Sequence, residues 1–85
     1  MKLIAEVIEV RLAPDGSRPI NFVWRLREYK IVEVLAATST VDFRRPWWRR
    51  KHRDLYRVAV DTGQVFEIYF HRGPGKKYWV LSREL

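Results

Sequence analysis

The sequence predicts an all-β fold, either a small antiparallel barrel or a strongly bent sheet of about six strands. Three observations lead to this prediction. Several segments alternate apolar and polar residues with the period of a strand, turn residues separate these segments, and no segment has the pattern of a long helix. The expected strands are residues 3–12, 20–26, 29–35, 55–61, 64–70 and 78–81. With 85 residues, the chain is expected to form a single domain, residues 1–85.

The first expected strand, residues 3–12, is rich in branched apolar residues and places Ile8, Val10 and Leu12 on one face, with Glu9 and Arg11 on the other. A helix is the alternative for this segment, because helical spacing would also bring Leu3, Val7 and Val10 together.

A turn and a hairpin are expected next. Pro14-Asp15-Gly16 predicts a turn, because proline presets φ and glycine accepts the positive φ that follows. Residues 20–26 and 29–35 then form a predicted hairpin with a tight connection near Arg27-Glu28. In its first arm, one face is expected to carry the large apolar side chains of Ile20, Phe22, Trp24 and Leu26.

The strongest hairpin signal is Asp61-Thr62-Gly63, which suits a three-residue loop with glycine in the left-handed conformation. The arms on either side, residues 55–61 and 64–70, both alternate. Tyr56, Val58 and Val60 occupy one face of the first arm, and Phe66, Ile68 and Phe70 occupy one face of the second, alternating with Glu67. Residues 72–75 break the chain again before the last short strand, in which Trp79 is expected to face the core.

The positive charge is concentrated in one segment. The chain has 17 Lys and Arg against 10 Asp and Glu, a net charge of +7. Residues 44–53 contain six of these cations and no acid, so the rest of the chain is close to neutral. The six are Arg44, Arg45, Arg49, Arg50, Lys51 and Arg53. Such a run attracts polyanions, and the alternative is a solvated charged rim without a ligand.

Trp47 and Trp48 lie inside this basic run. Arginines contact phosphates, and exposed aromatic rings stack on bases, so this mixture is typical of nucleic-acid-binding surfaces. Adjacent residues of a strand face opposite sides, and we therefore expect one tryptophan in the core and one partly exposed. The predicted nucleic-acid-binding residues are Arg44, Arg45, Trp47, Trp48, Arg49, Arg50, Lys51 and Arg53.

Catalytic and metal-binding patterns are missing from the sequence. There is no cysteine, and the two histidines, His52 and His71, have no partner at metal-ligand spacing. Gly73-Pro74-Gly75-Lys76-Lys77 lacks the spacing and the Ser or Thr of a phosphate-binding loop. The expectation is a non-enzymatic protein with no cofactor and no metal site.

Two groups of residues carry a resemblance to a known family. The first is Pro19, Phe22, Trp24, Arg25, Arg27, Tyr29, Ile31, Val34 and Leu35. The second is Trp47, Trp48, Arg53, Asp54, Tyr56, Arg57, Val58, Gly63, Glu67, Tyr69, Trp79 and Leu81. In order and spacing they resemble a small uncharacterised bacterial all-β domain family, which usually has glycine at the position of Leu26. Its members occur alone and in the context of Y-family DNA-polymerase-like proteins of mutagenic repair. The resemblance implies a role near DNA and a repair-polymerase partner, and it supplies no catalytic residues.

The predicted function is therefore that of a non-catalytic module that associates with DNA or RNA, linked to DNA repair or translesion synthesis. The alternative is a protein-interaction module or a homodimer in which exposed aromatic residues anchor the interface. A small-molecule-binding barrel with an aromatic-lined pocket is a third class. The N-terminal segment carries Glu6 and Glu9 within its apolar run, so a signal peptide or membrane span is not expected, and the cytoplasm is the predicted location.

Overall fold

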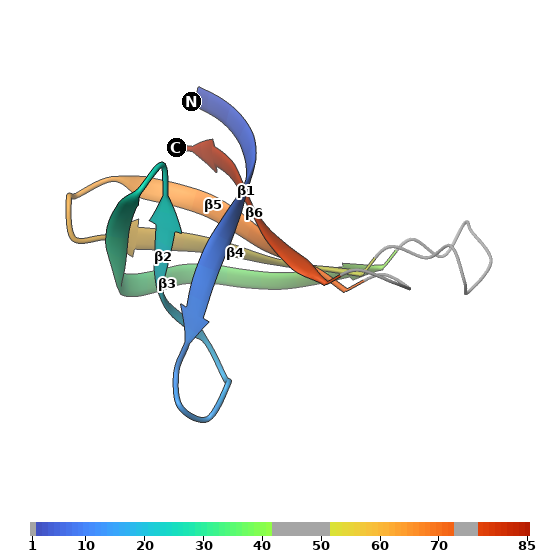
Figure 1. The fold of residues 1–85 in the computed structure, drawn as a ribbon. Helices are drawn as coiled ribbons and strands as arrows, with labels where there is room; N and C mark the ends of the chain where they lie inside the picture. The colour runs from blue at the N-terminus through green and yellow to red at the C-terminus, as the bar shows by residue number, and fades with distance from the viewer. Residues whose placement is uncertain (1, 42–51, 73–76) are drawn as a thin grey trace.

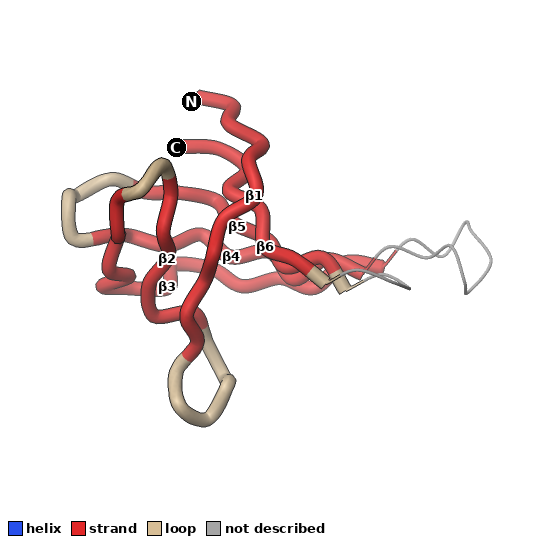
Figure 2. Tube along the Cα trace, viewed as in Figure 1, coloured by secondary structure: helices blue, strands red, loops and turns tan. Residues whose placement is uncertain are grey.

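A computed structural model describes residues 2–41, 52–72 and 77–85. These residues form six strands that close into a small antiparallel barrel in the order β1-β2-β3-β4-β5-β6, and no helix occurs among them (Figures 1 and 2). The strands are β1 (Lys2–Leu12), β2 (Pro19–Trp24), β3 (Arg27–Val41), β4 (His52–Val60), β5 (Val65–His71) and β6 (Tyr78–Glu84). The predicted all-β class and antiparallel barrel are confirmed. The helical alternative for residues 3–12 was wrong, because this segment is paired with both β2 and β6.

Each strand pairs with its neighbour along the chain, and β1 pairs with β6 to close the ring. Closure needs strongly bent strands, and bulges supply the bend. The register of β1 against β6 shifts between Leu3 and Glu6, where Ala5 has a φ of 54°. Further shifts in β3 lie between Ile31 and Glu33 and between Val34 and Ala36.

Beyond the closed ring, four strands continue side by side as an open sheet. Figure 1 shows β3, β4, β5 and β6 running away from the β1–β2 hairpin toward one end of the molecule. Along β3, pairing with β2 is limited to the first residues, Arg27 to Lys30, whereas pairing with β4 continues as far as Val41. The open sheet therefore has its inner surface exposed where β1 and β2 no longer cover it.

The core lies inside the closed part of the ring. It consists of buried residues from all six strands: Ile8, Phe22, Tyr29, Val58, Val60, Phe66, Ile68 and Leu81. Phe22 stacks on Tyr29 at 5.2 Å, and Phe66 meets Phe22 edge-on at 5.7 Å. Such offset and edge-to-face pairs are the favoured geometries of aromatic rings, so the centre of the barrel is an ordered aromatic cluster.

The loops follow the predicted turn chemistry with one exception. Gly16 donates its N–H to the carbonyl of Ala13 at a φ of 74°, and Gly63 donates to Val60 at a φ of 88°, so both predicted turns are confirmed. The β2–β3 turn lies at Arg25-Leu26, earlier than the predicted Arg27-Glu28. Arg27 already pairs with Trp24.

Three predicted details differ from the structure for physical reasons. Leu26 is fully exposed rather than directed into the core, because it occupies the β2–β3 turn. β3 extends to Val41 rather than ending at residue 35, because β4 offers it partners along its whole length. Glu67 is only 2% exposed, although the alternation of β5 places it on the outer side. The guanidinium groups of Arg57 and Arg83, on the neighbouring strands, cover it and pair with its carboxylate.

Candidate functional site

Only one of the predicted nucleic-acid-binding residues, Arg53, lies within the described residues. Arg44, Arg45, Trp47, Trp48, Arg49, Arg50 and Lys51 lie outside the described residues, and so the prediction of one buried and one exposed tryptophan stays a prediction. Arg53 is exposed near the start of β4, and its guanidinium lies 4.9 Å from the ring centroid of Tyr69. This is a cation–π contact on the outer side of the sheet.

Arg53 belongs to a surface that we call the outer aromatic–basic face, formed by Arg53, Tyr69, His71 and Tyr78. Strand pairing brings it together, because Arg53 is paired with His71 and His71 with Tyr78. The rings of His71 and Tyr78 lie 4.9 Å apart and are tilted by 32°. Arg53 and Tyr78 are exposed, while Tyr69 and His71 are half-buried. The face thus offers three rings and the Arg53 cation to solvent, and none of its members is acidic.

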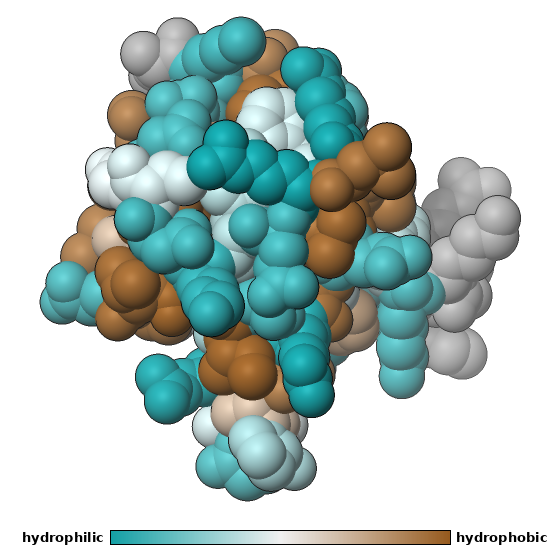
Figure 3. Space-filling view, turned by 60° about the vertical axis from the view of Figure 1, so that its left-hand side comes forward, coloured by the Kyte–Doolittle hydropathy of each residue, from teal (hydrophilic) through white to brown (hydrophobic). Residues whose placement is uncertain are grey.

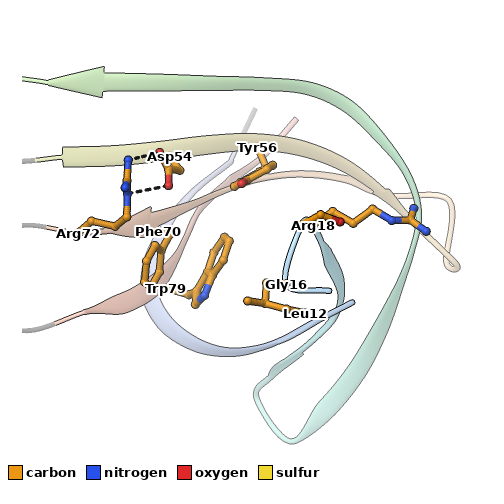
Figure 4. Close-up of a pocket in the computed structure, with 9 residues that line it drawn as sticks. Leu12, Gly16, Arg18, Asp54, Tyr56, Phe70, Arg72 and Trp79 are labelled. Atoms are coloured by element: carbon orange, nitrogen blue, oxygen red, sulfur yellow. Dashed lines mark hydrogen bonds and ion pairs between the residues drawn. The ribbon is translucent and has the colours of Figure 1, made fainter. Parts of the chain in front are cut away.

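A pocket of about 210 Å³, which we call the inner pocket, lies on the opposite side of the same strands. Its walls are the rings of Tyr56, Phe70 and Trp79, with Leu12 and the β1–β2 loop, residues 13–18, across from them (Figure 4). Trp79 lies 5.0 Å from Phe70 and 5.6 Å from Tyr56, with ring planes tilted by 37° and 38°. All three rings are only half-buried, because their free surfaces open into the pocket.

Polar groups occupy one end of the inner pocket. Arg72 binds the Asp54 carboxylate through two contacts, at 2.9 Å and 3.1 Å, and the Ser39 hydroxyl donates to the same carboxylate at 2.8 Å. Figure 4 shows this pair beside Phe70, whereas the Arg18 guanidinium extends away from Phe70 and Trp79. The charged lining residues are Arg18, Arg72 and Asp54, which leaves one excess positive charge.

The lining of the inner pocket includes a protonated Tyr56 hydroxyl and a β1–β2 loop with internal hydrogen bonds. Burial raises the pKa of the Tyr56 phenol above its ordinary value of 10, so the hydroxyl stays protonated and can donate a hydrogen bond at neutral pH. In the β1–β2 loop, the Asp15 carboxylate accepts hydrogen bonds from the backbone N–H of Ser17 at 3.0 Å and from its hydroxyl at 2.7 Å. These bonds lower the pKa of Asp15. They also order the turn within this loop.

The comparison with protein families matches the whole chain, residues 1–85, to the family described as Domain of unknown function (DUF6504). The chain belongs to this family. No curated protein and no solved structure matches the chain. The expectation of a small uncharacterised domain family is confirmed, and the family description carries no activity, ligand or partner.

The described part of this DUF6504 chain holds no group of three His, Cys, Asp or Glu residues close enough to bind a metal ion. In residues 2–41, 52–72 and 77–85, no helix is long and apolar enough to cross a membrane. Within the described residues, aromatic rings and cations occur on both sides of β4 and β5.

Sequence reasoning missed both the inner pocket and most of the outer aromatic–basic face. Tyr69, His71 and Tyr78 were visible as aromatic residues in β-forming segments, but only the strand register shows that they share one surface with Arg53. The alternation around Phe70 and Trp79 correctly indicated their inner position. It did not indicate that the barrel leaves their rings partly uncovered.

Proposed function

We propose that this domain is a non-catalytic module that binds nucleic acid through the outer aromatic–basic face and the adjoining basic run. The observation that carries the proposal is the exposed Arg53 guanidinium stacked over Tyr69. This contact presents a planar cation and an aromatic ring together, and both groups recur where proteins bind single strands.

Charge supports the same interpretation. The net charge is +7, and the sequence segment with the highest density of cations, residues 44–53, runs into β4 at Arg53. A phosphate backbone that contacts Arg53 and the other cations of this segment would release counterions, and this release drives association at low salt. The rings of Tyr69, His71 and Tyr78 supply stacking surfaces beside Arg53.

The sequence resemblance supports a biological setting for this activity. Related domains occur alongside Y-family DNA-polymerase-like proteins of mutagenic repair, which work on single-stranded template. A module of this kind would hold template DNA near a repair-polymerase partner and contribute to translesion synthesis. This partner is part of the proposal and rests on that association.

The proposal is tested by fluorescence anisotropy with a labelled single-stranded oligonucleotide and a labelled duplex at several salt concentrations. Arg53→Ala should weaken binding and make the slope of log affinity against log salt shallower by about 0.7, the value expected for one lost contact to a single strand. Arg27→Ala is the matched control. Arg27 is also exposed and lies 5.2 Å from a tyrosine ring, that of Tyr29, but on the β2–β3 hairpin.

The two variants separate a local site from a general effect of charge. Equal losses in Arg53→Ala and Arg27→Ala would show that only net charge matters, and would refute a site on the outer aromatic–basic face. If the wild-type protein binds neither oligonucleotide at low salt, the proposed function is wrong.

A second candidate function, self-association, is favoured by the free edge of β3. Among the described strands, only β4 pairs with β3 beyond Ile31. Charged residues and proline usually protect an edge strand against pairing with another chain. Residues 34–41 along this edge contain neither. Val32 and Leu35 are exposed beside it, at 66% and 49%.

Light scattering at physiological salt tests self-association. A dimer that pairs through β3 should dissociate in Thr38→Lys, because a charge beside the edge opposes pairing, and should persist in the loop variant Thr62→Lys. A monomer at high protein concentration would exclude this candidate. High salt should weaken nucleic-acid binding but leave the dimer intact.

A further inference from the structure

The inner pocket has the size of a site for one ring system. An apolar cavity of about 150 Å³ holds benzene, and pockets for whole drug-sized ligands begin at roughly 300 Å³. The volume of about 210 Å³ lies between these values. A ligand with one ring or two fused rings therefore fits, and several linked groups do not.

The lining of the pocket favours a flat and polar ring. Tyr56, Phe70 and Trp79 present faces and edges to the same space, and such surfaces bind planar rings by stacking. The protonated Tyr56 hydroxyl and the Asp54–Arg72 pair supply hydrogen-bond donors and acceptors at the margin. A hydrocarbon ring would form no hydrogen bond with these polar groups, whereas a heterocyclic base could bond to them.

The position of the pocket identifies the source of such a base. The two surfaces share one set of strands, because Asp54 follows Arg53 in β4, Phe70 follows Tyr69 in β5, and their side chains alternate. The outer aromatic–basic face and the pocket therefore lie back to back on these strands, separated by the thickness of one sheet. Paired bases are inaccessible inside a duplex, so only an unpaired base could enter.

We infer that the inner pocket binds one unpaired nucleobase of a single strand, between the rings of Phe70 and Trp79 and the β1–β2 loop. This inference rests on the proposed function. Beyond the proposed function, the inference predicts that the domain binds single strands more tightly than duplexes. It also predicts tighter binding to strands that carry bases than to abasic strands. The bound chemistry is that of a planar heterocycle, which a nucleic-acid strand or a free nucleotide could supply.

The experiment compares a thymidine oligonucleotide with one of equal length that carries only abasic sites, and with a duplex. Leu12 lies at the end of β1, lines the pocket and is 41% exposed. Leu12→Trp should therefore fill the pocket and leave the core intact. Leu3→Trp is the matched control on the same strand, 79% exposed and outside the pocket lining. Thymidine 5′-monophosphate is titrated separately, and the indole N–H resonance of Trp79, assigned with Trp79→Phe, is followed by NMR.

The wild-type protein and Leu3→Trp should prefer the thymidine strand over the abasic strand by at least about fivefold, which corresponds to roughly 1 kcal/mol for one stacked base. Leu12→Trp should reduce this preference by about fivefold, leaving only the part due to stacking on the outer aromatic–basic face, and should retain the wild-type affinity for the abasic strand. The mononucleotide should shift the Trp79 resonance with a lower affinity than the thymidine strand.

Other outcomes overturn the inference in distinguishable ways. If Leu12→Trp keeps the full wild-type preference, the pocket is not a base site, while the proposed function stands. If the mononucleotide binds as tightly as the strand, the site belongs to free nucleotides rather than to nucleic acid. If the wild-type protein binds no strand at low salt, the inference and the proposed function both fail.

Discussion

Leu26→Gly should stabilise the domain, although it removes a large side chain. Arg25 and Leu26 form the two-residue β2–β3 turn with φ values of 51° and 65°, the left-handed conformation that a type I′ hairpin requires at both positions. The Leu26 side chain is fully exposed, so its removal sacrifices no burial.

The magnitude follows from two opposing terms. A left-handed conformation costs a residue with a Cβ atom about 1–2 kcal/mol, which glycine avoids. Glycine loses more chain entropy on folding, which costs about 0.5–1 kcal/mol. The net gain in the free energy of unfolding is then about 0.5–1 kcal/mol, or a rise in Tm of about 2–8 °C for a domain of this size.

Urea unfolding followed by tryptophan fluorescence measures this difference. Leu26→Ala is the control, because alanine removes the same exposed side chain but retains the Cβ strain, and its stability should lie within about 0.5 kcal/mol of the wild type. Leu26→Asn should fall between alanine and glycine, since asparagine tolerates the left-handed region. A glycine variant no more stable than the alanine variant would refute the assignment of strain to Leu26.

Three further predictions concern other parts of the chain. Glu67→Gln should lower the free energy of unfolding by about 1–3 kcal/mol, measured by thermal or urea unfolding. The reason is that the buried carboxylate between Arg57 and Arg83 would lose its charge-assisted interactions with the two guanidinium groups. An unchanged stability would contradict this role. The hydrogen bond from Arg25 holds the pKa of Glu6 below its ordinary value of 4.5. The ionised carboxylate therefore stabilises the fold above about pH 4.5, and this stabilisation is lost as the pH falls through the lowered pKa. Glu6→Gln should consequently be less stable than the wild type at pH 7 and approach it at pH 3, and a gap that is the same at both pH values would argue against this ion pair. Arg49→Ala combined with Arg50→Ala should weaken oligonucleotide binding for all sequences and make the salt slope shallower by about 1.4, as anisotropy titrations at several salt concentrations would reveal.

Much of the barrel could be predicted because local signals agreed with the tertiary structure. The β4–β5 hairpin combines alternation on both arms with a glycine at the one loop position that needs a positive φ. The Pro14-Asp15-Gly16 turn is similar. The β2–β3 turn could not be placed, since Arg25 and Leu26 are not turn-forming residues and the pairing of Trp24 with Arg27 imposes their conformation.

The missed features depend on neighbours that are distant in the sequence. The alternation of β5 correctly places Glu67 on the outer side, but its burial depends on arginines contributed by two other strands. The inner pocket likewise requires the β1–β2 loop to lie across from residues of β4, β5 and β6. One sequence contains the residues of such a site, whereas the register and the bulges determine which of them meet.

The two surfaces of the β4–β5–β6 sheet also restrict how this chain can change in length. Arg53 and Asp54, Tyr69 and Phe70, and Tyr78 and Trp79 are successive residues with side chains on opposite sides. A deletion of one residue within these strands would turn the residues beyond it over, exchanging a ring on the outer side for a ring on the inner side. A deletion of two would keep each side chain on its side and only shorten the sheet. During evolution, insertions and deletions in this region should therefore be tolerated in pairs, while the loops between the strands are free to vary by single residues.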